Sequence, residues 1–372
     1  MDLLEQLTTN LGYGPAMSDT PEQFVIVCSL KSDDATVRLQ SLPILRGLQK
    51  GAVTATLIDP MSEPLEIATP SWAIFHYTDT PALAALRTQP RDRFKGICLS
   101  SDIYGYTEYQ EILDLTDLFI VPTETHRKVL AAGIPRPVYT VPECIDPVAL
   151  YNIHEAQICH SRKPPRLFWF GYSESFEKAM ASLVPVIQHN LAQGRIGCFD
   201  LILNERNFNN RFAFQTRQYE PHLFRSMARQ YDYAILSHFA LDLHVNSLIK
   251  SPNKAVTALI SGVIPLATDT PNYGELFRRL GLEKFLFSSP GELDTLLGRL
   301  NPSEDMDLIA RNKVRERLMD WYSEAALFKA FVSAVQAYKV EPATLPIAPS
   351  SWSIEGPQQR SILTAIKRRL MG

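Results

Sequence analysis

The residues best suited to chemistry stand at the start of one predicted helix. Asn253 is a residue type that caps helices, Gly262 is a typical helix end, and the apolar run 263–268 behind it predicts a buried strand. The unpaired backbone amides of a first helical turn favour an anion, and Lys250 and Lys254 add positive charge beside them. The segment therefore predicts a binding site for a diphosphate.

This segment resembles the donor-binding helix of GT-B glycosyltransferases, in particular those of family 4. The spacing between Lys254 and Gly262 matches that of the family, and Pro265 follows in the next predicted strand. The resemblance implies that Ser251, Asn253 and Lys254 face the diphosphate of a nucleotide sugar.

The rest of the second half is similar to the same family. The resemblance implies that Gly171 forms the turn that opens the nucleotide domain and that Lys178 reaches the donor phosphates. It also places Ser237 and His238 at a strand end. Considered alone, Lys178 also fits a surface lysine and His238 a structural histidine. The likeness covers residues 165–340, whereas the first half matches by architecture only.

One position departs from the family pattern. Family 4 enzymes usually have a glutamate five residues before the glycine that ends the helix, and this glutamate binds the ribose hydroxyls. The chain has Thr257 there, which leaves open an altered donor site. Lys254 also fits a solvated lysine of the first turn. Several arginines in a loop-rich stretch fit solvated charge better than contacts to donor phosphates: Arg206, Arg211, Arg217 and Arg225.

The first half of the chain offers candidates for contact with an acceptor. His76, Asp79 and Asp102 each follow a predicted strand, and Asp102 stands in a polar and aromatic loop suited to a sugar hydroxyl. An inverting transferase needs a base to deprotonate the acceptor hydroxyl, whereas a retaining one does not need it in the same way. Asp102 and His76 are the candidates for that base or for an acceptor contact, and a structural role is the alternative for both.

No residue pattern indicates a metal or an organic cofactor. Asp305 and Asp307 spell a D-x-D, but they stand at a helix start rather than after a strand, unlike the motif of metal-dependent GT-A enzymes. The sequence has no P-loop, no H-E-x-x-H and no G-x-G-x-x-G after the first strand, and its histidine pairs lack a metal-ligand spacing. We therefore expect no metal and no cofactor, with the nucleotide sugar as a substrate.

Short apolar runs alternate with segments of helical spacing in both halves of the chain. Nearly continuous apolar strands of this kind indicate parallel sheets covered on both faces. The expected fold class is α/β GT-B: two Rossmann-like domains whose parallel sheets face a cleft. We expect an acceptor domain, a nucleotide-sugar domain, a helix crossing back to the first domain, and an irregular tail with a short basic amphipathic helix, at residues 1–155, 165–322, 323–340 and 341–372.

Composition and charge restrict the location and the partners. A hydrophobic content of 45% with 21% charged residues is typical of globular chains, and a net charge of −3 argues against a general nucleic-acid binder. No apolar run is long enough to span a membrane and the N-terminus lacks a secretory pattern, so we expect a cytoplasmic protein. The basic and apolar residues within 360–370 favour weak peripheral contact with the inner face of a membrane or with a partner.

Together these features predict a glycosyltransferase that moves a sugar from a nucleotide-diphosphate donor to a hydroxyl of a glycan, a lipid-linked glycan, a protein or a small molecule. The helix start and Lys254 would stabilise the leaving diphosphate without a metal. Two alternatives stay open: a nucleotide-sugar epimerase of the same architecture, and a non-catalytic GT-B-like subunit that binds a partner, which Thr257 favours.

Overall fold

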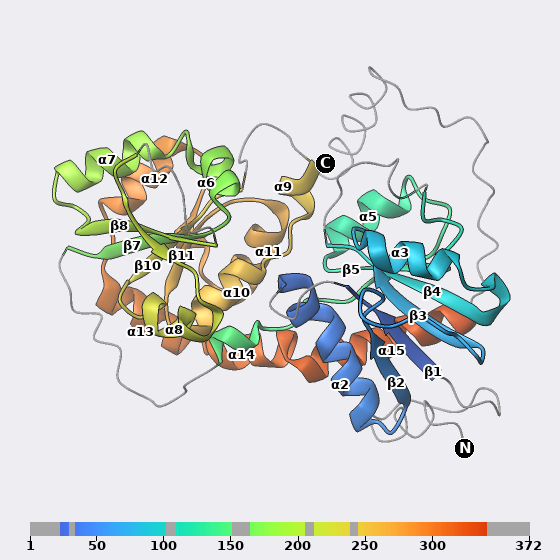
Figure 1. Ribbon diagram of the computed structural model, residues 1–372. Coiled ribbons are helices and arrows are strands. Elements are labelled where there is room, and N and C mark those ends of the chain that lie inside the picture. Colours follow the sequence, from blue (N-terminus) through green and yellow to red (C-terminus); the bar gives the residue numbers. More distant parts are fainter. Residues whose placement is uncertain are drawn as a thin grey trace. The chain divides into compact units, whose positions relative to one another are not determined.

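The computed structural model describes residues 23–29, 34–101, 109, 111–150, 164–204, 212–238 and 245–340 (Figure 1). As far as these residues are described, the chain forms two compact units. The first unit draws on the ranges Met1–Lys31, Ser41–Pro142 and Phe328–Gly372, and the second on Ser32–Gln40 and Glu143–Leu327.

The first unit contains a sheet of six parallel strands in the order β2-β1-β3-β4-β5-β6. Strands β3 and β5 are buried along their whole length, as expected for a parallel sheet with both faces covered. The strands are β1 (Gln23–Val27), β2 (Thr54–Ile58), β3 (Ser71–His76), β4 (Phe94–Leu99), β5 (Leu118–Val121) and β6 (Val138–Thr140).

Helices connect and cover the strands of this unit. Thr123 caps one of them, α5, by accepting a hydrogen bond of 3.1 Å from the amide of His126. Helix α15 packs here through aromatic pairs, with the Phe331 ring 6.1 Å from the ring of Phe24. The helices are α2 (Leu42–Lys50), α3 (Thr80–Arg87), η2 (Arg91–Arg93), α5 (Glu124–Ala131) and α15 (Glu324–Val340). The π-helical turn before α2 (Val37–Ser41) and the first turn of α15 fall largely within the ranges of the second unit.

The second unit contains another sheet of six parallel strands, in the order β12-β11-β10-β7-β8-β9. Every neighbouring pair is parallel, so the carboxyl ends of all these strands lie along one side, which we call the carboxyl edge. The expected α/β class with two parallel sheets is confirmed. The strands are β7 (Arg166–Gly171), β8 (Cys198–Leu203), β9 (Gln215–Gln218), β10 (Tyr233–Leu236), β11 (Ile264–Thr268) and β12 (Leu286–Phe287).

Helices cover both faces of this second sheet. Figure 1 shows α7 and α12 on one face and α8, α10, α13 and α14 on the other. The helices are η3 (Pro147–Ala149), α6 (Ser173–Met180), α7 (Val184–Ala192), η4 (Pro221–Leu223), α8 (Phe224–Ala228), α9 (Val245–Ile249), α10 (Asn253–Ile260), α11 (Pro271–Leu280), η5 (Glu283–Phe285), α12 (Pro290–Leu297), α13 (Pro302–Arg311) and α14 (Val314–Tyr322).

Some elements differ from the sequence prediction. Helical spacing in the sequence predicts one helix over 175–192 and another over 304–321. The first is two helices, α6 and α7, and the second breaks at Lys313, whose φ is 49°. Strand β9 was not predicted because its residues are polar and half-buried or exposed, so they give no apolar run. The sequence also predicts a helix over 107–116, but its residues 111–115 form turns.

Within the described ranges, no helix combines the length and the apolar character that crossing a bilayer requires. Residues 360–370, for which the sequence predicts weak membrane contact, lie outside the described residues. That contact therefore stays a prediction.

Candidate active site

Three adjacent strands of the second sheet end beside the start of helix α10. Strands β7, β10 and β11 are neighbours and end at Gly171, Leu236 and Thr268. The start of α10 is held at this edge because the Lys254 ammonium donates a hydrogen bond of 3.0 Å to the Phe170 carbonyl, next to the end of β7. The helix start therefore lies at the carboxyl edge, where open α/β sheets bind ligands.

The first turn of α10 differs from the prediction in its cap. Asn253 is the first helical residue rather than the cap, and Pro252 before it has no side chain that caps the helix. Instead the Ser251 hydroxyl accepts a hydrogen bond of 3.3 Å from the Asn253 amide. At the other end, Gly262 has a φ of +85° and stops the helix, as predicted.

The Lys254 side chain turns inward rather than into solvent. Its ammonium lies 4.8 Å from the ring centroid of Trp169 and 5.5 Å from that of Phe170, in addition to its hydrogen bond with the Phe170 carbonyl. Burial, followed by the charge of Lys250, lowers the pKa of Lys254 to about 8. A lysine ammonium has three donors, and one of them is used here, so the others are available to an anion.

Gly171 makes room for this ammonium. Its φ of +145° is a conformation that side-chain-bearing residues rarely adopt. A Cβ at this position would lie 2.6 Å from the Lys254 Nζ and 2.8 Å from the Trp169 ring. A glycine is therefore needed at this position for two reasons: the backbone conformation at the turn, and the close approach of the Lys254 ammonium.

His238 is the second ionisable group at this edge. Its ring stacks on Tyr273 at 4.8 Å, and its amide donates a hydrogen bond of 3.2 Å to the Thr268 hydroxyl. Burial, followed by the charges of Lys254 and Lys250, lowers the pKa of His238 to about 3, so the imidazole is neutral near pH 7. Its Nε2 is buried and meets no hydrogen-bond partner among the described residues.

Other residues at this edge support the site, and the sequence did not single them out. Asn272, at the start of α11, donates hydrogen bonds of 3.0 and 2.9 Å to the carbonyls of Leu248 and Lys250, and so fixes the loop that precedes α10. Thr270 caps α11 through the Tyr273 amide. The Thr270 cap could have been predicted from the sequence, because a threonine before a proline is typical of a helix that starts after a strand.

Two predicted donor contacts are less accessible than expected. Thr257, at the position where family 4 has a glutamate, is buried in the middle of α10. The Ser237 hydroxyl donates a hydrogen bond of 3.1 Å to the neighbouring His238 carbonyl. Lys250 is half-buried, and its charge acts on both Lys254 and His238.

Lys178 makes no contact with Lys254 or His238 among the interactions of the described residues. It lies exposed on α6, where it forms an ion pair with Glu174 one turn earlier. Such a pair is typical of a solvated helix surface. A contact between Lys178 and donor phosphates would require this pair to open.

The first unit places His76 at a strand end, as predicted. Its Nδ1 lies 2.7 Å from the Thr78 hydroxyl and its Nε2 lies 3.5 Å from the Ser101 hydroxyl. Asp79 has a structural role, because it caps α3 through the Ala82 amide at 3.1 Å. Asp102, the other candidate for a base, lies outside the described residues.

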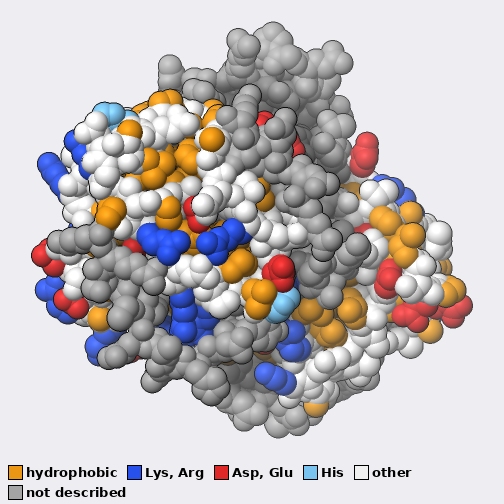
Figure 2. Space-filling model, turned by 60° about the vertical axis from the view of Figure 1, so that its left-hand side comes forward, with side chains coloured by type: hydrophobic (Ala, Val, Ile, Leu, Met, Phe, Trp, Pro, Cys, Tyr) orange, Lys and Arg blue, Asp and Glu red, His pale blue; other side chains and the backbone are white. Residues whose placement is uncertain are grey.

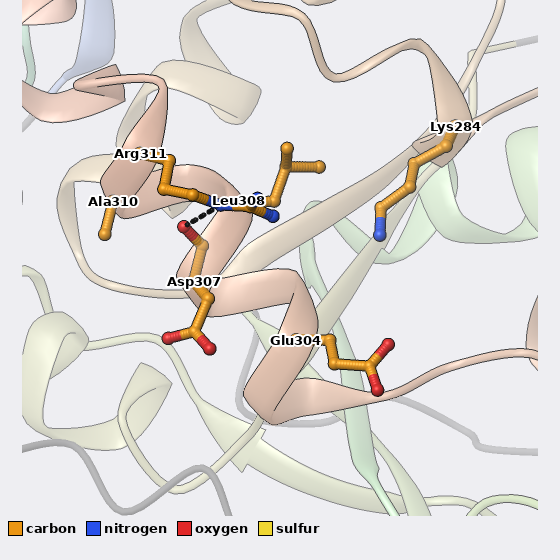
Figure 3. Close-up of a pocket in the computed structure, with 6 residues that line it drawn as sticks. All are labelled: Lys284, Glu304, Asp307, Leu308, Ala310 and Arg311. Carbon is orange, nitrogen blue, oxygen red and sulfur yellow. Dashed lines mark hydrogen bonds between the residues drawn. The ribbon is translucent and has the colours of Figure 1, made fainter.

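The D-x-D of Asp305 and Asp307 lies in helix α13, away from the carboxyl edge. Asp305 accepts hydrogen bonds from the Tyr233 hydroxyl at 2.5 Å and from Lys284, and Tyr233 is the first residue of β10. The adjoining hollow has a volume of about 800 Å³. Figure 3 shows Lys284, Glu304, Asp307 and Arg311 around it. This hollow lies at the amino ends of the strands. Among the described residues, no cluster of three His, Cys, Asp or Glu is placed to hold a metal.

No family model and no curated protein matches the chain. Solved structures do. The chain is similar to an α,α-trehalose-phosphate synthase (UDP-forming) from Burkholderia vietnamiensis, with a TM-score of 0.56 and 11% identity over 86% of this chain and 99% of that one. The fold is the GT-B fold.

Two further structures show the same arrangement. An α-glucosyltransferase in complex with UDP and DNA has a TM-score of 0.56 at 11% identity, and covers 85% of this chain and 100% of that one. S. aureus TarM in complex with UDP has a TM-score of 0.52 at 12% identity over 73% of this chain. The chain spans about 56% of the length of TarM.

Proposed function

We propose that this protein is a glycosyltransferase that moves a sugar from a nucleoside-diphosphate donor to a hydroxyl of an acceptor. The observation that carries the proposal is the Lys254 ammonium at the first turn of α10, on the carboxyl edge of a parallel sheet. A helix start with an ammonium beside it suits a diphosphate. The structures of TarM and of the α-glucosyltransferase hold UDP, which supports a UDP-sugar as the donor.

In the proposed reaction, the bond between the anomeric carbon and the donor phosphate oxygen breaks, and an acceptor oxygen takes its place. The departing diphosphate gains negative charge, which Lys254 and Lys250 would stabilise without a metal. The first hydrogen bond of α10 joins the Val256 amide to the Pro252 carbonyl at 3.1 Å. The amides of Lys254 and Ala255 precede that bond, so they are directed toward the donor diphosphate in this scheme.

Neighbouring residues complete the proposed donor site. Gly171 leaves space for the ammonium, Ser251 holds the first turn, and neutral His238 offers its buried Nε2 to the donor without repelling Lys254. The resemblance to family 4 adds Asn253 and Ser237 as donor contacts.

The first unit is proposed to bind the acceptor: a glycan, a lipid-linked glycan or a protein. His76 and Asp102 are the proposed acceptor contacts, and one of them would take the proton of the hydroxyl if the reaction inverts the anomeric centre. His76 is 6% exposed, and its ring nitrogens lie within hydrogen-bonding reach of the Thr78 and Ser101 hydroxyl groups.

One observation favours a second function, a non-catalytic subunit that binds a partner. Thr257 is buried and is too short to replace a glutamate that binds ribose hydroxyls. Such a subunit would have the GT-B fold but would not bind a nucleotide.

Binding of nucleotides separates the two functions. We expect UDP or another nucleoside diphosphate to raise the melting temperature, because a ligand at 100 times its Kd stabilises the folded state by about 2.7 kcal/mol. A thermal-shift panel of nucleoside diphosphates and nucleotide sugars makes the measurement. A protein that responds to none of them would support the non-catalytic subunit and would contradict the transferase.

The lowered pKa of Lys254 predicts that nucleotide affinity depends on pH. Since the charged ammonium binds the diphosphate, affinity is expected to fall as the pH rises above about 8. The stability of the ligand-free protein should instead increase as the pH rises. The folded pKa lies below the ordinary value of 10.5, so the unfolded chain holds more protons between these pH values, and this group makes the fold more stable as the pH rises.

Calorimetric titration of the nucleoside diphosphate at several pH values tests the first half of this prediction, and chemical denaturation of the free protein tests the second. The Lys254→Met variant is the control, because it should lose both pH dependences. Equal pH profiles in the variant and the wild type would exclude Lys254 as the titrating group.

A further inference from the structure

Charge is spread unevenly over this protein, although its net charge is only −3. Figure 2 shows several Lys and Arg side chains close together on one face. A local excess of one sign of charge favours anionic ligands whatever the sum over the chain. In the second unit, Arg225 is a buried arginine whose charged neighbours are also arginines.

Arg225, in α8, is 5% exposed, which contradicts the prediction of a solvated charge. Its Nε and Nη1 are buried and meet no acceptor in the described part of the chain. Buried arginines normally pair with a carboxylate or with carbonyl oxygens, because a guanidinium cannot lose its proton at accessible pH. An unsatisfied buried guanidinium therefore indicates that an anionic partner is missing.

The charges around Arg225 are of the same sign. Arg229 follows α8 at i+4, and its Nε is also buried without an acceptor among the described residues. Burial, followed by the charges of Arg229 and Arg315, lowers the pKa of Arg225. Both charges that act on it are arginines, so the cluster repels itself until an anion enters.

The start of α14 adds backbone donors to this cluster. Arg315 is the second residue of α14, and Lys313 before the helix supplies no side-chain cap. The first-turn amides of a nine-residue helix then lack a capping oxygen. Arg315 is exposed and its charge acts on the buried Arg225, so an oxyanion bound between them can reach the cluster from the surface.

This cluster belongs to the side of the sheet opposite the carboxyl edge. Arg229 lies only a few residues before β10 begins at Tyr233. Asn312, just before α14, donates hydrogen bonds of 2.9 and 3.0 Å to the carbonyls of Leu280 and Gly281, where α11 ends. Helix α11 starts after the carboxyl end of β11 and runs away from it, so these contacts lie toward the amino ends of the strands. The cluster is therefore distinct from the Lys254 site.

We propose that Arg225, Arg229 and Arg315 form a second anion site, which binds a phosphoryl group. A tetrahedral dianion offers oxygens in several directions, which suits donors that come from two helices. The group belongs either to free phosphate or to a phosphorylated small molecule.

The test compares inorganic phosphate and glycerol 3-phosphate with chloride at matched ionic strength. We expect phosphate to raise the melting temperature of the wild type and to leave that of Arg225→Met almost unchanged, with its Kd weakened at least about tenfold. Without phosphate, Arg225→Met should be at least as stable as the wild type, because the variant removes an unpaired buried charge. If Arg225→Met does not fold, Arg225→Lys takes its place as the test variant, because lysine keeps the positive charge and removes the guanidinium.

Two further variants separate this site from the donor site and from general charge effects. Lys254→Met should keep the phosphate response, and Arg299→Met, which removes an exposed arginine, should keep it as well. A response lost in Lys254→Met but kept in Arg225→Met would place the phosphate at α10 and overturn the proposal, as would a wild type that does not respond. A response to glycerol 3-phosphate shows that the phosphoryl group is bound on a larger molecule; a response to phosphate alone shows that the free ion is the ligand.

Discussion

Replacing Lys254 with methionine is expected to weaken nucleoside-diphosphate binding by about 30- to 150-fold, which corresponds to about 2–3 kcal/mol for a charged hydrogen bond in a partly desolvated site. Methionine keeps an unbranched apolar chain beside Trp169, one atom shorter, and removes the ammonium with its charge and its hydrogen-bond donors. The Phe170 carbonyl loses its donor, but a half-buried charge is removed at the same time. We therefore expect the free energy of unfolding without ligand to change by no more than about 1 kcal/mol.

The control for this variant is Lys178→Met. Both lysines resemble donor contacts in the sequence, but Lys178 lies exposed and paired with Glu174. Its loss should change affinity by less than about threefold, as for a surface ion pair. Calorimetric titration of both variants, with urea denaturation, makes the comparison. Normal nucleotide affinity in Lys254→Met, or a larger loss of affinity in Lys178→Met, would show that the donor phosphates do not bind at α10.

Replacing Gly171 with alanine is expected to have the largest effect on the fold. The methyl group would lie 2.6 Å from the Lys254 Nζ and 2.8 Å from the Trp169 ring, at a φ of +145°. Backbone strain of about 1–3 kcal/mol adds to an overpacking cost of similar size, so we expect a loss of about 2–5 kcal/mol in unfolding free energy. The displaced ammonium should also reduce nucleotide affinity.

Gly194→Ala is the matched control for Gly171→Ala. Gly194 also has a positive φ, +65°, but a Cβ there would meet nothing within 4 Å. The unfolding free energy of this variant should fall by only about 1–2 kcal/mol, since the backbone conformation is the only source of strain. Urea denaturation of both proteins gives the two values. Equal losses would mean that the space beside Gly171 does not matter, and that Lys254 can move aside freely.

The fold was largely predictable because its strands are almost continuously apolar. Runs such as residues 72–75 and 118–121 are buried on both faces, and only a parallel sheet between helices produces that pattern. The short polar strand β9 lacks the signal and was missed. The break at Lys313 was missed too, because helical spacing continues across it.

The candidate site was predictable in its residue types but not in its contacts. The sequence shows a lysine at a helix start, but the Phe170 carbonyl and the Trp169 ring that hold Lys254 come from a strand 84 residues earlier. The cap was misassigned for a local reason: Asn253 is a typical capping residue, but the helix begins one residue after Pro252, and the Asn253 amide donates to the Ser251 hydroxyl instead. Burial of Arg225 had no signal, since charged residues are normally exposed.

A crystal structure of the protein with UDP, or with the nucleoside diphosphate that stabilises it most, tests directly whether α10 binds the donor diphosphate. We expect a phosphate oxygen at about 3 Å from the Lys254 Nζ and from the first amides of α10, with Gly171 alongside. A diphosphate bound elsewhere, with the Lys254 ammonium still in contact only with the Phe170 carbonyl, would exclude α10 as the donor site.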